Sequence, residues 1–79
     1  MKNKIIILIT DGEIFNSEEI LKILNKNRHT ITFLLIQIGA HSNFSQKLKE
    51  LGFNVTIIKN IDNLKIIVLD FLKKVYLLN

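Results

Sequence analysis

Apolar runs of strand length alternate along this chain with longer stretches in which apolar residues recur at helical spacing. The runs of strand length are residues 4–10, 30–38 and 53–58. The first two are nearly continuous in aliphatic residues, which is typical of strands covered on both faces. The third partly alternates and so predicts a less buried edge strand. Because the first run is almost entirely isoleucine and leucine, we expect that strand to be central in the completed sheet.

Three stretches with helical periodicity separate and follow these runs. The expected helices begin at Ser17, at Ser42 or Asn43, and at about Asn63, and they end near Asn27, just before Gly52 and at about Leu77. Each has an apolar stripe with a spacing near 3.6 residues. In the first helix the stripe is Ile20, Leu21, Ile23 and Leu24. In the last it is Leu64, Ile67, Val68, Phe71, Leu72 and Val75, widened by Ile66, Leu69, Tyr76 and Leu78.

Capping signals support two of these helix starts. Asn16 precedes the first helix and Glu19 lies at the third helical position, which predicts a capping box. Phe15 and Ile20 occupy the positions of a hydrophobic staple around the same start. Asp62 is expected to cap the last helix. The order of elements is therefore βαβαβα, which is typical of a parallel sheet with helices packed on it in two or three layers.

The composition limits what such a chain can be. The sequence has 79 residues, 48% of them hydrophobic, with no Cys and no Pro. We therefore expect one Rossmann-like α/β half-domain over residues 1–79. The lack of Cys excludes a disulfide scaffold and a cysteine zinc site, and the apolar content excludes a disordered chain. A chain this short without disulfides is marginally stable unless it associates or is heavily apolar, and this one is heavily apolar.

Charge and hydropathy argue against two classes of partner. The formal net charge is +4 at pH 7, but the lysines are scattered and only Lys73 and Lys74 are adjacent. Without interleaved aromatic residues, this pattern argues against nucleic-acid binding. No apolar run reaches the ~20 residues that a membrane-spanning helix needs, and the N-terminal run breaks at Thr10 without a cleavage site. We expect no membrane partner and a cytoplasmic location.

Polar residues that follow the three strands are candidates for a ligand site, because ligands of open parallel sheets bind beyond the carboxyl ends of the strands. They are Asp11, Gly12 and Glu13, then Gly39, His41 and Ser42, then Lys59, Asn60 and Asp62. Asp11, Glu13 and His41 have the chemistry of a metal site or an acid/base pair. The alternative is structural: a turn at Asp11, a solvated Glu13, and His41 in a loop before a helix.

Other chemistry has weaker signals in this sequence. Residues 39–42 lead into a helix N-terminus that could receive a phosphate, but neither glycine-rich nucleotide motif is present. No Gly-x-Ser-x-Gly elbow and no cysteine nucleophile occur. His29 lies beside Arg28 at the end of the first helix, where a cation favours the helix dipole, so a capping role is expected. These observations indicate a protein that is not an enzyme and holds no resident cofactor.

Several segments resemble one family in their order and spacing. Residues 5–12 resemble the hydrophobic strand ending in Thr-Asp-Gly of von Willebrand factor A domains, and residues 35–39 resemble the following strand ending in Ile-Gly. Residues 48–52, residues 54–58 and Leu64 are similar to the closing helix, last strand and terminal helix of that family. The resemblance covers the C-terminal half of such a domain. It implies the strand order 1-2-3, in which right-handed crossovers place the first two helices on one face and the last on the other.

The resemblance also implies a weak metal site. The family's adhesion site uses an Asp-x-Ser-x-Ser loop and a separate threonine, and neither loop is present here. Only Asp11 matches a metal ligand of the family, and one carboxylate leaves most of an octahedral Mg²⁺ shell to water or a partner. Weak Mg²⁺ or Mn²⁺ binding at Asp11 is therefore the most that the resemblance implies for the isolated chain.

The sequence favours a non-enzymatic protein-interaction module that self-associates. One helix covers only part of a sheet face, so the apolar arc of the last helix and the edge of the first strand are expected to be buried in a homodimer or against a protein partner. The first alternative is a Rossmann-like protein that binds a small ligand or a nucleotide. The second is an auxiliary basic protein that binds nucleic acid.

Overall fold

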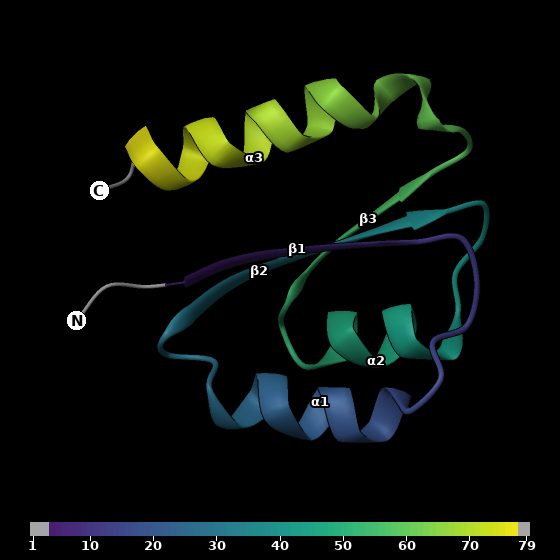
Figure 1. The fold of residues 1–79 in the computed structure, drawn as a ribbon, viewed down its shortest axis with the longest axis vertical. Helices are drawn as coiled ribbons and strands as arrows, with labels where there is room; N and C mark the ends of the chain where they lie inside the picture. The colour runs from purple at the N-terminus through teal and green to yellow at the C-terminus, as the bar shows by residue number, and fades with distance from the viewer. Residues whose placement is uncertain (1–3, 78–79) are drawn as a thin grey trace.

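The predicted elements are present in the computed structural model, which describes residues 4–77 (Figure 1). They are β1 (Lys4–Thr10), α1 (Ser17–Lys26), β2 (Ile31–Ile38), α2 (Asn43–Glu50), β3 (Asn54–Ile58), a short 3₁₀ turn (Ile61–Asn63) and α3 (Leu64–Leu77). Leu78, which the sequence pattern adds to the apolar arc of the last helix, lies outside the described residues. The element types are confirmed, and their ends agree with the periodicity to within one or two residues.

The three strands form an open, parallel sheet in the order β1-β2-β3, which confirms the expected fold class. Leu35 in β2 lies beside Leu8 of β1 on one side and Val55 of β3 on the other. Within one chain the first strand is not the central one, because β2 has both neighbours and β1 lies at an edge of the described sheet. Burial follows this order: residues 33–37 of β2 are buried in succession, whereas Ile6 and Ile9 of β1 are exposed.

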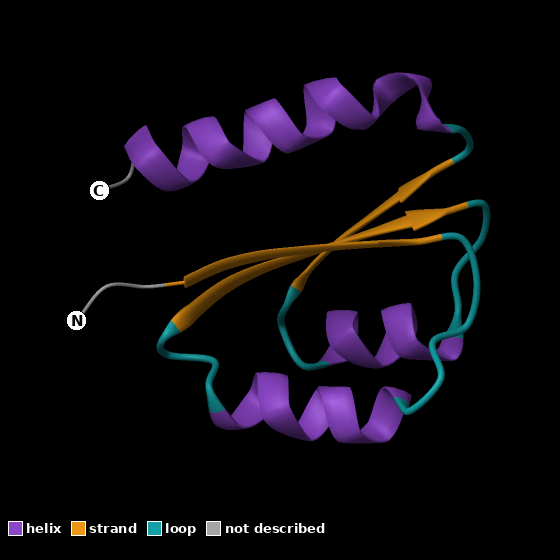
Figure 2. Cartoon of the chain, in the orientation of Figure 1, coloured by secondary structure: helices purple, strands orange, loops and turns teal. Residues whose placement is uncertain are grey.

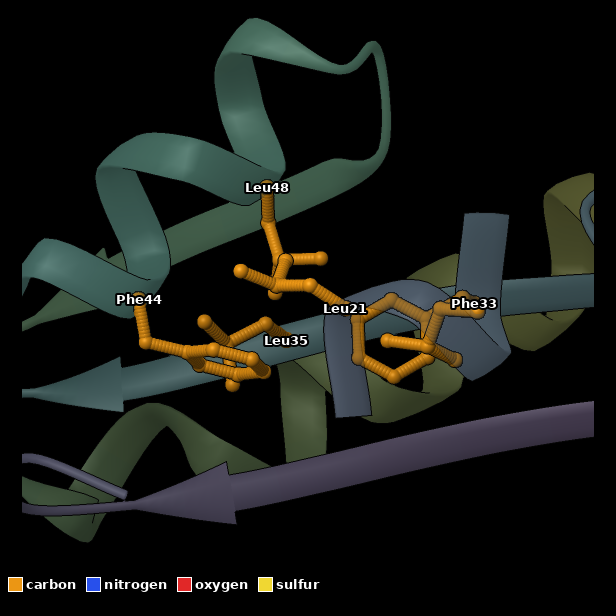
Figure 3. Close-up of a cluster of buried hydrophobic side chains, with 6 residues drawn as sticks. Leu21, Phe33, Leu35, Phe44 and Leu48 are labelled. Atoms are coloured by element: carbon orange, nitrogen blue, oxygen red, sulfur yellow. The ribbon is translucent and has the colours of Figure 1, made fainter. Parts of the chain in front are cut away.

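The helices cover the sheet in the expected way, with α1 and α2 on one face and α3 on the other (Figure 2). Side chains of β2 alternate between the two faces because a strand has a period of two residues. Phe33 and Leu35 pack against α1 and α2, whereas Leu34 and Ile36 pack toward α3. The first of these cores is shown in Figure 3, and its buried members are Leu21, Leu24, Phe33, Leu35, Phe44 and Leu48.

The start of α1 differs from the expected capping box. Asn16 has a φ of 64°, in the left-handed region, and its side chain makes no capping hydrogen bond. An N-cap side chain reaches the helix backbone from an extended residue, so a left-handed Asn16 cannot act in that way. Asparagine tolerates this conformation better than most residues. The staple is absent as well, since the Phe15 side chain is 89% exposed.

The apolar stripe of α1 is narrower than its sequence suggests. Leu21 and Leu24 are buried against the sheet, but Ile23 is 61% exposed. Four apolar residues at positions i, i+1, i+3 and i+4 cover a wide arc of a helix. In the part of the chain that the structure describes, β1 is the last strand on this side of the sheet, so no further strand there covers the outer part of that arc.

The 3₁₀ turn before α3 also begins differently from the expectation. The Asn60 side chain, on an extended residue, accepts a hydrogen bond of 3.0 Å from the backbone N–H of Asp62. Asn60 therefore caps this turn in place of Asp62, and α3 starts at Leu64. The six residues of its expected inner stripe are all half-buried against the sheet or beside it. Within residues 4–77 the structure contains no helix with the length and apolar character required to cross a membrane.

Candidate functional site

The loops that follow the three strands lie at one end of the sheet, at the right of Figure 1. Two of these loops are joined directly by Glu13, from the segment between β1 and α1. One of its carboxylate oxygens accepts a hydrogen bond of 3.0 Å from the backbone N–H of Asn43, the first residue of α2. A carboxylate at a helix N-terminus is favoured by the helix dipole. Glu13 therefore connects the loop after β1 to the helix after β2.

Asp11 lies in the turn after β1. The Thr10 hydroxyl donates to the carbonyl oxygen of Gly12 at 3.1 Å and lies 3.3 Å from its N–H, which closes the turn. The Asp11 side chain is exposed. Within residues 4–77, no three His, Asp or Glu side chains lie together as a potential metal-binding group, so Asp11, Glu13 and His41 do not form one. A weak site at Asp11 alone stays a prediction.

The loop after β2 leads into a tightly capped helix. Gly39 has a φ of 102°, which a residue with a side chain adopts only with strain, and its N–H donates to the Ile58 carbonyl at 2.7 Å. Ser42 and Ser45 form a reciprocal capping box: the N–H of Ser45 donates to the Ser42 hydroxyl at 3.0 Å, and the N–H of Ser42 donates to the Ser45 hydroxyl at 2.8 Å. His41 is exposed, with Nδ1 3.4 Å from the Ser45 hydroxyl oxygen.

A buried polar pair lies beneath this loop. Gln37, near the end of β2, is 1% exposed, and its side-chain oxygen accepts a hydrogen bond of 3.0 Å from the Ser42 hydroxyl. Ser42 therefore caps α2 and satisfies Gln37 at the same time. Sequence reasoning included Ser42 but missed Gln37 and Ser45. The available signals were a lone polar residue in the apolar run 33–38 and a serine three positions after a potential cap.

These contacts use the groups that would bind an anion at the start of α2. The N–H groups of Ser42, Asn43 and Ser45 all donate to side chains of this chain. A phosphate at residues 39–42 would have to displace the Glu13 carboxylate from Asn43. On the third loop, Lys59 and Asp62 are exposed, and Asn60 is engaged in its own turn. The rim residues with hydrogen-bonded side chains therefore stabilise the junctions between strands and helices, and they are Glu13, Ser42, Ser45 and Asn60.

The opposite end of the sheet has a groove that the sequence pattern did not predict. Its volume is about 420 Å³, and it lies between the start of β1 and the last turns of α1. It is lined by Lys4, Ile6, Ile23, Leu24, Asn27, Thr30 and Ile31. Aliphatic side chains form much of its surface, so the groove suits an apolar group from another molecule.

The turn between α1 and β2 is held by Asn27 and Arg28. The Asn27 side chain donates to the Ile23 carbonyl at 2.8 Å and caps the end of α1, which is the role expected of His29. His29 is exposed. Arg28 donates to the Leu51 carbonyl, and its guanidinium lies 4.9 Å from the centre of the Phe53 ring. These contacts connect the turn after α1 to the loop after α2.

Comparison of the chain with family models, with curated proteins and with solved structures finds no match. The class of protein is therefore defined by the fold itself. It is an α/β domain with a three-stranded parallel sheet, helices on both faces and one strand edge beside an apolar groove.

Replacing Asp11 with alanine tests the metal prediction. Because Asp11 is exposed, the free energy of unfolding is expected to change by less than about 0.5 kcal/mol. Calorimetric titration of the wild type is expected to detect Mg²⁺ or Mn²⁺ only weakly, with a dissociation constant on the order of millimolar, and Asp11→Ala should abolish that binding. Asp62→Ala, which removes an exposed carboxylate on another rim loop, is the control. Equal ion binding by the wild type and Asp11→Ala would exclude Asp11 as the ligand.

Proposed function

We propose that this protein is a non-enzymatic interaction module that binds another protein through the outward face of α3. The observation that carries the proposal is a set of large apolar side chains on that face which are exposed to solvent. They are Ile66, Leu69, Tyr76 and Leu77. Exposed apolar side chains that share one face of a helix are typical of protein-binding sites.

The charges on α3 favour one kind of partner. Lys65, Lys73 and Lys74 are exposed on this helix, against the single carboxylate of Asp70. A partner surface with apolar side chains flanked by acidic residues complements this pattern in both hydrophobicity and charge. An amphipathic helix with glutamates beside its apolar stripe has that chemistry, and it can pack along a second helix.

The rim residues support a binding module over the small-ligand alternative. Ser42 and Ser45 are hydrogen-bonded to each other, and the Glu13 carboxylate accepts a hydrogen bond from the backbone N–H of Asn43 in α2. Each of these contacts has a structural role in capping α2. The resemblance to the second half of a von Willebrand factor A domain belongs to the same proposal, and the strand order β1-β2-β3 is the one that this resemblance requires.

A synthetic peptide tests the proposed function. The probe is an amphipathic helix with leucines on one face and glutamates on either side of them, titrated into the labelled protein and followed by NMR chemical shifts. We expect shifts centred on the outer residues of α3. The variant Leu69→Glu should weaken binding by about tenfold or more, because it places a like charge in the apolar contact.

Two controls make this titration decisive. The same peptide with lysines in place of the glutamates should bind more weakly than the acidic peptide. The variant Ile9→Glu carries the same change of charge at a residue with the same 45% exposure as Leu69, but on β1, and should leave peptide binding unchanged. Absence of shifts on α3, or a preference of the wild type for duplex DNA that falls steeply with salt, would overturn the proposal.

A further inference from the structure

The edge of β1 presents unpaired backbone groups. Among the residues that the structure describes, β1 has β2 as its one neighbour, and the N–H of Lys4 donates to the Thr30 carbonyl at 3.1 Å. The peptide groups of a strand alternate in direction, so those of residues 4, 6, 8 and 10 are directed toward β2. The N–H and C=O groups of Ile5, Ile7 and Ile9 are therefore directed toward the open edge.

This edge lacks the features that normally prevent strand pairing. Proteins protect edge strands with charged residues, prolines, bulges or covering segments. β1 has the sequence KIIILIT, with one charge at its first residue, and its pairing with β2 is continuous over all seven positions. Two of its apolar side chains, Ile6 and Ile9, are exposed. Such a strand is suited to pairing with another strand.

We propose that a second copy of this chain adds its β1 to this edge in the antiparallel direction, which forms a continuous sheet across a two-fold axis. Closed symmetric dimers with self-complementary contacts are the commonest assemblies of soluble proteins. With Ile7 opposite Ile7 on the axis, Ile5 of each copy lies opposite Ile9 of the other. In this register every edge-directed N–H and C=O of the three residues is paired, since all three positions are of the hydrogen-bonded type.

The same register brings matching layers together. A two-fold axis perpendicular to the sheet keeps both copies of α1 on one face. α1 packs beneath β1 and β2. Adjacent strands lie about 4.8 Å apart, so a helix centred between β1 and β2 lies about one strand spacing from the two-fold axis. The two copies of α1 are then about 10 Å apart and antiparallel. That separation is the usual distance between packed helices. The exposed Ile23 of each α1 is then available for contact with the other helix.

The groove beside β1 gives this pairing a specific contact. Because the two copies of α1 run antiparallel, the start of one helix lies beside the end of the other. Phe15, 89% exposed and two residues before the start of α1, is then placed next to the groove of the second copy at Ile6 and Ile23. The groove volume of about 420 Å³ is ample for a phenyl ring. The dimer contact would therefore bury Phe15 and Ile23, two of the most exposed apolar side chains on this side of the molecule.

Charge complementarity favours the antiparallel direction. Lys4 is at the beginning of β1, and Asp11 follows its end. With Ile7 on the axis, Lys4 of each copy lies opposite Thr10 of the other, next to Asp11. Two pairs of opposite charge therefore form at the ends of the shared strand pair. A parallel arrangement would instead place the two copies of Lys4 side by side.

Sedimentation equilibrium of the full chain, with two variants of equal charge change, tests this assembly. The wild type is expected to be a dimer at micromolar concentrations. Ile9→Glu should raise the dimer dissociation constant by about 30-fold or more, because it places an unpaired charge in the shared sheet. Leu69→Glu, at the same 45% exposure on α3, should leave the dimer intact. For peptide binding the proposed function predicts the reverse: Leu69→Glu weakens it and Ile9→Glu leaves it unchanged. Either proposal can therefore be contradicted while the other holds.

Two measurements keep the test decisive if Ile9→Glu does not fold. In the wild type, amide exchange at Ile5, Ile7 and Ile9 should slow as the protein concentration rises, while exchange at Ile6 and Leu8 changes less. The chain has no Trp, so Phe15→Trp provides a single tryptophan, excited apart from Tyr76, whose emission should shift to the blue on association. A wild-type monomer at high micromolar concentration, or concentration-independent exchange at the three edge amides, would overturn the proposal.

Discussion

Replacing Phe44 with alanine is expected to lower the free energy of unfolding by about 3–5 kcal/mol. Phe44 lies on α2, is 1% exposed, and packs in the cluster that contains Leu21, Leu35 and Leu48 (Figure 3). Truncation of a buried phenyl ring removes its transfer free energy and leaves a cavity. A chain of 79 residues has a total stability of about 4–12 kcal/mol. The variant is therefore expected to be largely unfolded at physiological temperature.

Urea denaturation followed by far-UV circular dichroism measures this loss. Phe15→Ala is the matched control, since it is the same substitution at a residue that is 89% exposed. In dilute solution, where association does not contribute, Phe15→Ala should change the free energy of unfolding by less than about 0.5 kcal/mol. Similar losses in the two variants would contradict the placement of Phe44 at the centre of the core.

Hydrophobic periodicity predicts the elements of this fold because few competing signals interrupt it. Each apolar run of strand length ends at a polar turn or a glycine, and Gly39 and Gly52 do adopt positive φ values. The inner stripe of the last helix is correct at all six positions, because within residues 4–77 α3 is the one helix on its face of the sheet and a single stripe suffices. The alternation of strands and helices then leaves a parallel sheet as the natural arrangement.

The position of β1 could not be obtained from the same pattern. A continuous apolar run reports that both faces of a strand meet apolar neighbours, but it contains no information about how many strands lie beside it. β1 and β2 have similar sequences in this respect, yet only β2 is buried residue after residue. The left-handed Asn16 is a similar case, since the same asparagine is compatible with an N-cap and with a positive φ.

The sequence predicted which residues lie at the candidate site, but it did not predict which groups they contact. Glu13, His41 and Ser42 do lie at the carboxyl end of the sheet, as parallel topology requires. Their partners depend on side-chain directions that residue order does not specify. The carboxylate of Glu13 reaches the start of α2, thirty residues further along the chain, and Ser42 reaches back to Gln37. The groove at the other end of the sheet lies beside the open edge of β1. It could not be predicted from the sequence, because the apolar pattern does not show which strand lies at an edge.

Ser42→Ala is expected to lower the free energy of unfolding by about 1–3 kcal/mol, far more than loss of a surface hydroxyl. The Ser42 hydroxyl accepts from the N–H of Ser45 and donates to the side-chain oxygen of Gln37. Alanine removes the cap of α2 and leaves a buried oxygen without its donor. Because Gln37 is buried, no water replaces the missing hydroxyl. The Gln37 oxygen is then left without a donor, which lowers the free energy of unfolding.

A double-mutant cycle separates the cap from the buried pair. Gln37→Leu removes the oxygen that needs a donor, so Ser42→Ala in that background should cost about 1 kcal/mol less than in the wild type and retain only the loss of the cap. The measurement is urea denaturation of the four proteins of the cycle. Equal costs of Ser42→Ala in both backgrounds would mean that the hydrogen bond between Ser42 and Gln37 contributes nothing, and that Ser42 stabilises the fold through the capping box alone.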